Sequence, residues 1–297
     1  MAMKRRPLPT HRLLRHPVSI AAASRFTASL MIALLLAGVP SPASGAQPVR
    51  LLTGRDLEGR IPWLVDTRHQ DPRRVFSVAD GTLRISGDGL GYLATARSYS
   101  NYTLTVEWRW GATNTAWGDR LGKARDSGIF LHATGPHGNS HDGNGAFMAA
   151  IECNLFQGAT GDILLIRGTD HDSTPIAPRI TAEVAPERDP DGWFTWQPGG
   201  RVQTIERWGR LNWRRKSPRW QDVFDFRGPH DRERSPGRWN RVECEARGDR
   251  LRIRVNGTLV NEATRLWPAE GRILLQCEGS EILFRRVELL PHPPSAP

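Results

Sequence analysis

The stretch from residue 126 to residue 168 places polar side chains among three short apolar runs. The polar residues that interrupt these runs are His132, Glu152, Asn154 and Asp162. Alternate residues of a strand share a face, so Glu152 and Asn154 point to the same side of segment 149–156. Burying an unpaired carboxylate among apolar groups is costly. Glu152 is therefore expected either to have a partner, such as Arg109 or a backbone amide, or to line a cleft as a general base or metal ligand.

Two further side chains have types suited to proton transfer. Glu107 shares a strand face with Arg109, a spacing that fits a cleft-facing pair and equally an ordinary charge ladder. His132 shares a predicted strand face with Phe130, and histidine titrates near neutral pH. A lone histidine on a strand, however, more often has a structural role than a catalytic one. An enzyme built on these residues should bring Glu152, Glu107 and His132 to face one pocket.

The glycine-rich loop 137–145 holds candidate metal ligands. They are His137, His141 and Asp142, which His132 could join. Neutral imidazole is a common ligand of zinc and other transition metals. Residues 142–145, Asp-Gly-Asn-Gly, could instead help to bind calcium, although they lack the full series of oxygen ligands. The other interpretation is a solvated loop, so a divalent metal is an alternative cofactor and no cofactor is required.

The elements that must position these residues are short strands. Asp80-Gly81 lies between two alternating runs in 76–87, and Asn256-Gly257 lies between two more, which is typical of β-hairpins. Segment 102–110 alternates apolar and polar residues along its length. Helical periodicity is nearly absent after the first 46 residues. The sequence therefore predicts an all-β sandwich.

Residues 169–237 depart from this regular pattern, being rich in Pro, Arg, Trp and Asp. A structureless loop of this length is unusual in one domain, so we expect a long, loop-rich insertion over one edge of the sandwich, with a short strand near 200–207. Its tryptophans could form a stacking platform or anchor the insertion: Trp193, Trp196, Trp208, Trp213 and Trp220. Its cationic residues could bind an anionic ligand or be solvated: Arg207, Arg210, Arg214, Arg215, Lys216 and Arg219.

The N-terminus has the layout of a secretory signal peptide. A basic leader is followed by the apolar stretch 26–39 and by small residues at 43–46. This predicts a cleaved signal peptide over residues 1–46, one domain over 47–291 and a tail over 292–297. The alternative, a transmembrane anchor, needs about 20 apolar residues, and this stretch is shorter. The expected location is the periplasm or the extracellular medium, without a stable membrane anchor after cleavage.

The net charge limits which partners the chain is expected to bind, and the cysteine content limits whether disulfides are expected to stabilise it. The leader carries six of the ten net positive charges, which leaves +4 on residues 47–297 and no strong case for nucleic-acid binding. Three cysteines remain: Cys153, Cys244 and Cys277. Export permits disulfides, but the count is odd and each cysteine lies in an apparent strand. We favour buried free thiols over an essential disulfide.

The order of motifs resembles the 3-keto-disaccharide hydrolase domain family, long known as a domain of unknown function. The matching pieces are residues 51–57 (LLTGRDL), 80–83 (DGTL), 92–95 (YLAT), 102–109, 126–132 (DSGIFLH), 151–154 (IECN), 161–163 (GDI), 239–240, 256–257, 271–276 and 283–285. In order, they run from near residue 51 to residue 290, which is almost the whole chain after the predicted signal peptide. Two positions depart from the usual pattern, namely His132 in place of Arg and Asn154 in place of Gln.

The resemblance implies a concanavalin A-like β-sandwich, or jelly roll, and an exported hydrolase or lyase that cleaves 3-keto-glycosides or related saccharides. A ketone at carbon 3 acidifies the proton on carbon 2, so that a base can remove it while the group on carbon 1 leaves. Such a route needs a base, a group that stabilises the enolate and an acid. The resemblance supports Glu152 most directly among the catalytic candidates Glu152, Glu107 and His132.

Several polar groups could bind the saccharide substrate. The candidates are Arg109, Asn154, Asp126, Asp162 and Gln276. Asp126 and Asp162 lie beside glycine-containing turns, where aspartate is often structural, whereas Gln276 shares a strand face with Glu278. Two alternatives to the keto-glycoside enzyme stay open: a non-catalytic, lectin-like glycan-binding module and an ordinary glycosidase with two carboxylates.

Overall fold

The structure is a computed structural model that describes residues 46–140 and 145–293. The predicted signal peptide, His141 and Asp142 lie outside the described residues, apart from Ala46. In the described ranges, strands predominate, and one short 3₁₀ helix spans Trp117–Asp119. No helix in these ranges is long and apolar enough to cross a membrane.

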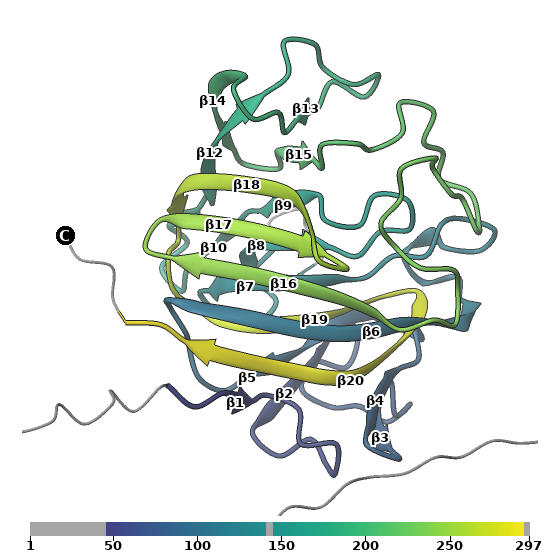
Figure 1. Ribbon diagram of the computed structural model, residues 1–297. Helices are drawn as coiled ribbons and strands as arrows, with labels where there is room; N and C mark the ends of the chain where they lie inside the picture. The colour runs from purple at the N-terminus through teal and green to yellow at the C-terminus, as the bar shows by residue number, and fades with distance from the viewer. Residues whose placement is uncertain (1–45, 141–144, 294–297) are drawn as a thin grey trace, which may run out of the picture. The chain divides into compact units, whose positions relative to one another are not determined.

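One sheet has ten strands (Figure 1). In spatial order they are β14 (Arg201–Glu206), β12 (Arg179–Val184), β18 (Thr258–Trp267), β17 (Arg250–Val255), β16 (Asn240–Arg247), β6 (Tyr102–Asn114), β20 (Ser280–Pro291), β4 (Thr82–Ile85) and β3 (Phe76–Ala79), with β1 (Val49–Arg50) also paired to β20. All of these pairings are antiparallel.

The second sheet has eight strands and lies behind the first in Figure 1. In spatial order they are β13 (Phe194–Thr195), β15 (Arg210–Asn212), β9 (Ile163–Ile166), β8 (Ala149–Asn154), β7 (Gly128–Thr134), β19 (Arg272–Glu278), β5 (Leu90–Thr95) and β2 (Arg60–Leu64). Only β13 and β15 pair in parallel in the described part of this sheet. A separate small ribbon joins β10 (Gly168–Thr169) to β11 (Pro175–Ile176).

The core forms between the facing sides of the two sheets. Leu104 and Val106 of β6 belong to the same buried cluster as Ile151 and Cys153 of β8. The Cys153 thiol meets the Cys244 thiol of β16 in a hydrogen bond across this interior. All three cysteines are buried and free. Each fully buried aliphatic side chain contributes about 1.5–3 kcal/mol to stability, so this shared layer holds the sheets together.

The two sheets, stacked through one core, make the concanavalin A-like jelly roll that the sequence predicts. Both expected hairpins are present, as β3 pairs with β4 and β17 pairs with β18. Segment 169–237 supplies edge strands to both sheets: β12 and β14 extend the ten-stranded sheet, and β13 and β15 extend the eight-stranded sheet. The insertion therefore continues the sandwich at one edge as well as covering it.

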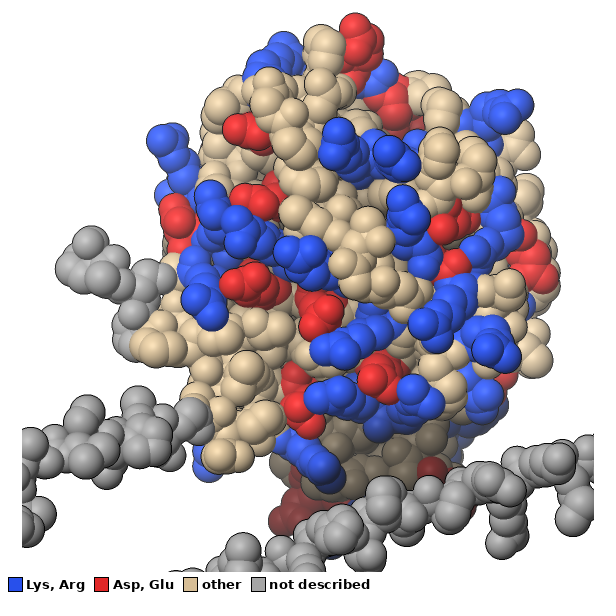
Figure 2. Space-filling view, viewed as in Figure 1, with Lys and Arg blue, Asp and Glu red and all other residues tan. Residues whose placement is uncertain are grey.

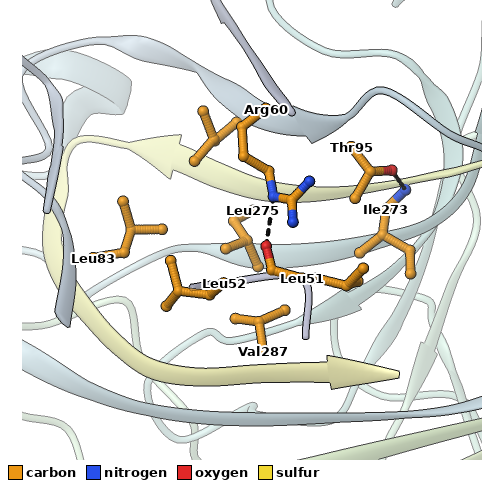
Figure 3. A pocket seen from close by; sticks show the side chains of 9 residues that line it. Leu51, Leu52, Arg60, Leu83, Thr95, Ile273, Leu275 and Val287 are labelled. Carbon is orange, nitrogen blue, oxygen red and sulfur yellow. Dashed lines mark hydrogen bonds between the residues drawn. The ribbon is translucent and has the colours of Figure 1, made fainter. Parts of the chain in front are cut away.

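A small cavity lies between the sheets beside the N-terminal segment (Figure 3). Leucines line most of it, and Arg60 Nε donates a hydrogen bond to the Leu51 carbonyl at 2.5 Å. Its volume is about 20 Å³. A space of that size holds about one water molecule, so it is a packing defect of the core, too small for a sugar.

Candidate active site

Several polar residues lie in one row across the outer face of the eight-stranded sheet, and they include the predicted site residues Asn154 and Gln276. Directly paired residues share a face, and the register pairs Trp63 with Tyr92, Tyr92 with Gln276, and Gly128 with Asn154. Gln276 lies next to Gly128, because Leu275 pairs with Ile129. The Asn154 amide donates to the Asp162 carbonyl, which continues the row onto β9. Strand alternation and pairing therefore bring together residues that are far apart in the sequence.

Glu152 lies in the adjacent row, which is mostly apolar. It pairs with Phe130 on one side and with Leu164 on the other. Ala150 and Phe130 belong to a second apolar cluster on this outer face, and Glu152 itself is only 2% exposed. Burial beside these apolar groups removes the carboxyl group from water, which disfavours its charged form.

Asn154 connects Glu152 to Asp126. Its Nδ2 donates to Glu152 Oε1 at 2.7 Å and lies 3.3 Å from Asp126 Oδ1. On its other side, Asn154 Oδ1 accepts a hydrogen bond from Arg210 Nη2 at 3.3 Å. One amide therefore holds two carboxyl groups and is itself oriented by a guanidinium group.

The two carboxyl groups titrate at different pH. Burial, reinforced by the nearby Asp126, raises the pKa of Glu152 to about 8, although Asn154 and Arg210 oppose this shift. Burial also raises the pKa of Asp126, to about 6, and the positive charges of Arg120 and Arg210 limit the rise. Between these values Asp126 is ionised and Glu152 is protonated. A pair of this kind offers one base and one acid at neutral pH.

Cations lie along the β9 and β15 side of the site. Arg210 Nε is 3.7 Å and Lys216 Nζ is 3.5 Å from Asp162 Oδ2, and Asp162 Oδ1 accepts a hydrogen bond from the Trp213 amide. Asp162 is fully buried. It therefore fixes Arg210, which in turn contacts Asn154. The sequence placed Arg210 and Lys216 in a general basic cluster and did not single them out as site residues.

Gly128 lies in the row between Gln276 and Asn154, and neighbouring side chains fill the space above it. A Cβ atom at this position would lie 2.3 Å from Glu152 Oε1 and 2.8 Å from Gln276 Oε1. Both distances are far shorter than van der Waals contact, so the absence of a side chain lets the two oxygens approach this point from either side. Gln276 Nε2 donates to Glu278 Oε2 at 2.6 Å.

A hollow of about 540 Å³ opens within the insertion, at the β15 end of the row. Asn212, Lys216 and Trp220 contribute to its lining. Lys216 Nζ donates to Asn212 Oδ1 at 2.9 Å and also contacts Asp162. Contacts thus run from the hollow through Lys216, Asp162 and Arg210 to the two carboxyl groups.

The expectation that Glu107 shares a pocket with Glu152 is wrong. Glu107 lies on the outer face of the ten-stranded sheet, where Arg285 Nε binds its Oε2 at 2.7 Å. Arg109 lies on the same face, with its guanidinium 4.9 Å from the Trp239 ring. Strand β6 pairs with β16 and β20, so neither residue reaches Glu152. Of the two earlier interpretations, the charge ladder describes Glu107.

The expected place of His132 beside Phe130 is also wrong. A β-bulge after Leu131 shifts the register of β7, and His132 has a positive φ of 55°. The extra residue reverses the alternation, so His132 points into the interior. There its ring lies 5.7 Å from the Tyr102 ring, and its Nδ1 is 2.9 Å from the Pro268 carbonyl oxygen. Burial lowers the pKa of His132 to about 4, which keeps it neutral at physiological pH.

His137, the described member of the predicted metal set, belongs to an aromatic group. Its Nδ1 is 3.0 Å from the Tyr92 hydroxyl, and its ring stacks on Trp63 at 5.9 Å. Burial, together with Arg272 and His69, lowers the pKa of His137 to about 4. Within the described ranges, no group of three or more His, Cys, Asp or Glu side chains could hold a metal ion. The candidates His141 and Asp142 lie outside those ranges.

The tryptophans of the insertion have mixed roles. Trp196 and Trp213 are buried in the main core, Trp208 is exposed, and Trp220 lines the hollow. Trp220 also contacts Phe156 with ring centroids 4.8 Å apart. Its Nε1 donates to the Gln157 carbonyl at 2.9 Å, so Trp220 anchors the insertion as Trp196 and Trp213 do, although its ring also borders the hollow. The cationic cluster is divided in the same way, because Arg210 and Lys216 face the site whereas Arg214 and Arg215 are exposed.

Comparison with protein families identifies the whole domain. The family model of the 3-keto-alpha-glucoside-1,2-lyase-like domain matches residues 47–290. The chain belongs to this family. The description of this family places the chain among carbohydrate-active domains. No curated protein matches the chain.

Several solved structures resemble the chain. The carbohydrate binding module CBM66 from Bacillus subtilis is 12% identical, with a TM-score of 0.39 over 77% of this chain and 93% of that one. Bacillus licheniformis beta-glucanase is 10% identical, with a TM-score of 0.41 over 84% of this chain and 100% of that one. LamAcat from Zobellia galactanivorans is 11% identical, with a TM-score of 0.42 over 84% and 98%.

Proposed function

We propose that this domain cleaves 3-keto-glycosides or closely related saccharides, with Asp126 as the base and Glu152 as the acid. The observation that supports this most is the pair of buried carboxyl groups held by Asn154, whose pKa values of about 6 and about 8 leave one ionised and one protonated at neutral pH. The sequence suggested Glu152 as the base. Its apolar surroundings favour the neutral form and hence the role of acid.

The reaction proceeds by elimination followed by addition of water. Asp126 removes the proton on carbon 2, which the ketone at carbon 3 acidifies, and the electron pair passes into the enolate. The enolate then expels the oxygen on carbon 1, which takes the proton of Glu152, and a double bond forms between carbons 1 and 2. Arg210, fixed by Asp162, supplies positive charge near the carboxyl pair and stabilises the enolate. Water adds across the double bond, so the net change is hydrolysis.

A second candidate is an ordinary glycosidase that retains the anomeric configuration. Asp126 Oδ1 and Glu152 Oε1 lie 3.3 Å and 2.7 Å from the same Asn154 nitrogen. They are therefore at most about 6 Å apart, which is below the 6.5–9.5 Å of inverting glycosidases and compatible with the roughly 5–5.5 Å of retaining ones. This reaction needs no ketone and leaves the proton on carbon 2 in place.

Isotope incorporation separates the two reactions. Purified residues 47–297 are incubated in D₂O with methyl 3-keto-α-glucoside and, in parallel, with the unoxidised methyl α-glucoside. We expect conversion of the keto-glycoside alone, with deuterium at carbon 2 of the product above the level of an enzyme-free control. Conversion without deuterium would support the retaining glycosidase. Binding of glycans with no conversion of either compound would instead support a lectin-like module.

We also propose that the chain is exported to the periplasm or the medium through residues 1–46. The basic leader, apolar stretch and small residues support this proposal. Expression of the full chain in a bacterial host, followed by mass measurement of the periplasmic fraction, tests it. The expected product begins at Gln47. An uncleaved chain in the cytoplasm would contradict it.

A further inference from the structure

Two aspartates share one arginine beside the carboxyl pair. Arg120 Nη1 and Nη2 donate to Oδ1 and Oδ2 of Asp222, each at 3.1 Å. The same guanidinium group lies 3.9 Å from Asp126 Oδ2. The contact with Asp222 is a pair of parallel hydrogen bonds, which is the strong form of an arginine–carboxylate contact, whereas the contact with Asp126 is too long for a hydrogen bond. Arg120 is therefore held by Asp222 and acts on Asp126 through its charge alone.

The other contacts of Arg120 keep its guanidinium group in place. Its Nε donates to the Gly118 carbonyl at 2.9 Å, and its Nη1 also donates to the Ala124 carbonyl at 3.3 Å. Asp222 is fixed in turn, because the Ala124 amide donates to its Oδ1 at 3.1 Å. Nη1 carries two N–H groups, and both are engaged. Nη1 can therefore hydrogen-bond Asp126 only by giving up Asp222 or Ala124.

This arrangement leaves one oxygen of Asp126 available to a substrate. Its Oδ1 lies 3.3 Å from the Asn154 amide nitrogen, whereas its Oδ2 has no hydrogen-bond partner in the part of the chain that the structure describes. The Asp126 side chain is 14% exposed, so it reaches the surface. A carboxylate that is hydrogen-bonded directly to an arginine holds its charge more firmly and is a weaker base. By occupying Arg120, Asp222 keeps Asp126 from becoming such a carboxylate.

The charges around Asp126 are arranged in the same way on both sides. The charged and titratable groups that face it are Arg120, Arg210, Asp222 and Glu152. Burial raises the pKa of Asp126 to about 6, the two arginines oppose this rise, and Asp222 adds to it. Arg210 has its own aspartate partner, Asp162, at 3.7 Å. Each arginine near Asp126 is thus paired with another aspartate, which limits how far the two positive charges lower the pKa of Asp126.

We propose that Asp222 is a positioning residue of this domain, which holds Arg120 in two hydrogen bonds and so prevents it from closing on Asp126. The role of Asp126 as the base rests on the proposed function, whereas the sharing of Arg120 rests on the contacts of Asp222. Asp222 belongs to the insertion 169–237. The insertion therefore sets the pH range of a carboxyl pair that lies outside it.

Titration of Asp126 tests the proposal without turnover. Carbon-13 NMR follows the Asp126 carboxyl group in the wild type and in Asp222→Asn, and Asp126→Asn serves to assign the signal. Asp222→Asn removes the negative charge and one of the two acceptors that hold Arg120. The pKa of Asp126 should therefore fall from about 6 to about 5. Asp222→Ser also lacks the charge and should shift the pKa in the same direction.

Asp225→Asn is the matched control for Asp222→Asn. Asp225 lies three residues further along the same segment and binds a different arginine, Arg125. This variant should leave the pKa of Asp126 at about 6. A crystal structure of Asp222→Asn is the second measurement, and it should show Arg120 within hydrogen-bond distance of Asp126 Oδ2. An unchanged pKa of Asp126, or an Arg120 that stays in place, would overturn the proposal.

Kinetics connect the titration to the reaction. If Asp126 is the base, Asp222→Asn should keep about half of its maximal kcat/KM for methyl 3-keto-α-glucoside at pH 5, whereas the wild type keeps about one tenth. If the pKa of Asp126 falls as expected but the wild type converts no keto-glycoside, only the proposed function fails. If the wild type converts the keto-glycoside but Asp222→Asn leaves the pKa of Asp126 unchanged, only the positioning role fails.

Discussion

Glu107 and Glu152 lie on the outer faces of opposite sheets, and their surroundings differ in almost every respect. On the ten-stranded sheet, Glu107 binds Arg285 at 2.7 Å and has Arg286 at 3.7 Å. Around it, Arg241 pairs with Glu243, and Arg252 pairs with Glu262. Figure 2, seen from this side, shows acidic and basic side chains intermixed over the face. Water and opposite charges satisfy these groups.

On the eight-stranded sheet, Glu152 lies between Phe130 and Leu164, and within the described ranges no cation forms an ion pair with it. Glu152 accepts a hydrogen bond from a neutral amide, that of Asn154. The groups that cover a strand face therefore decide whether a glutamate on that face can take part in proton transfer. Where the face is covered by apolar groups, the carboxyl group keeps its proton to a higher pH and can donate it to a substrate.

The largest expected effect is on turnover. Glu152→Gln removes the transferable proton but keeps the acceptor oxygen for Asn154, so kcat for methyl 3-keto-α-glucoside should fall about 10³-fold, within the range for loss of a general acid. Glu107→Gln, the matched change on the other sheet, should alter kcat less than twofold. Steady-state kinetics with circular dichroism as a folding check measure both. Comparable losses of kcat in the two variants would mean that Glu152 is no more important for turnover than Glu107.

The second expected effect is a bell-shaped dependence of kcat/KM on pH. The base Asp126 must be ionised and the acid Glu152 protonated, and their pKa values are about 6 and about 8. Activity should therefore be highest between pH 6 and pH 8 and fall about tenfold per pH unit on either side. Initial rates across pH 4–10 with a non-ionising substrate measure it. A profile that stays flat from pH 7 to pH 10 would rule out Glu152 as the acid.

Strand alternation predicted the polar face of β8 correctly, because its rule is local. Glu152 and Asn154 share a face, and the residues that alternate with them, Ile151, Cys153 and Leu155, point into the core. The sequence could not show which sheet each strand joins. Strand β6 carries Glu107 in the same alternating pattern, but it pairs with β16 and β20, both more than 120 residues further along the chain. That choice is made by long-range packing.

A local irregularity and the insertion account for the remaining differences between the predicted site and the structure. One bulge in β7 turned His132 from the predicted outer face into the core, and nothing in its neighbouring residue types marks the bulge. Arg210 contacts the site because β15 pairs with β9, a pairing hidden in a segment with weak alternation. Arg120, which tunes Asp126 from 3.9 Å, follows the short 3₁₀ helix. Such residues become visible only when the strands are assembled.

The third expected effect is a gain in stability at the expense of activity. The folded-state pKa of Glu152, about 8, lies above its ordinary value of 4.5. The folded chain therefore holds a proton that the unfolded chain releases above about pH 4.5, so this group makes folding less favourable as the pH rises toward 8. Glu152→Gln has no such proton and should be more stable than the wild type by about 4 kcal/mol at pH 8, with the difference vanishing below pH 4.5. Urea unfolding at pH 4 and pH 8 measures this, and a variant that is less stable at pH 8 would contradict it.

The smallest expected effect concerns the ion pair on the opposite face. Glu107→Gln removes the partner of Arg285, whose side chain is 47% exposed, and exposed pairs contribute about 0.2–1 kcal/mol. The variant should lose no more than that in urea unfolding at pH 7, and the loss should shrink in 1 M NaCl because salt screens exposed charges. The gain in Glu152→Gln at pH 8 should persist in the same salt, since it arises from burial. If salt reduced the stability gain of Glu152→Gln, solvent would have to reach the Glu152 carboxyl group. The two faces would then carry different residues but would not differ in the burial that raises the pKa of Glu152.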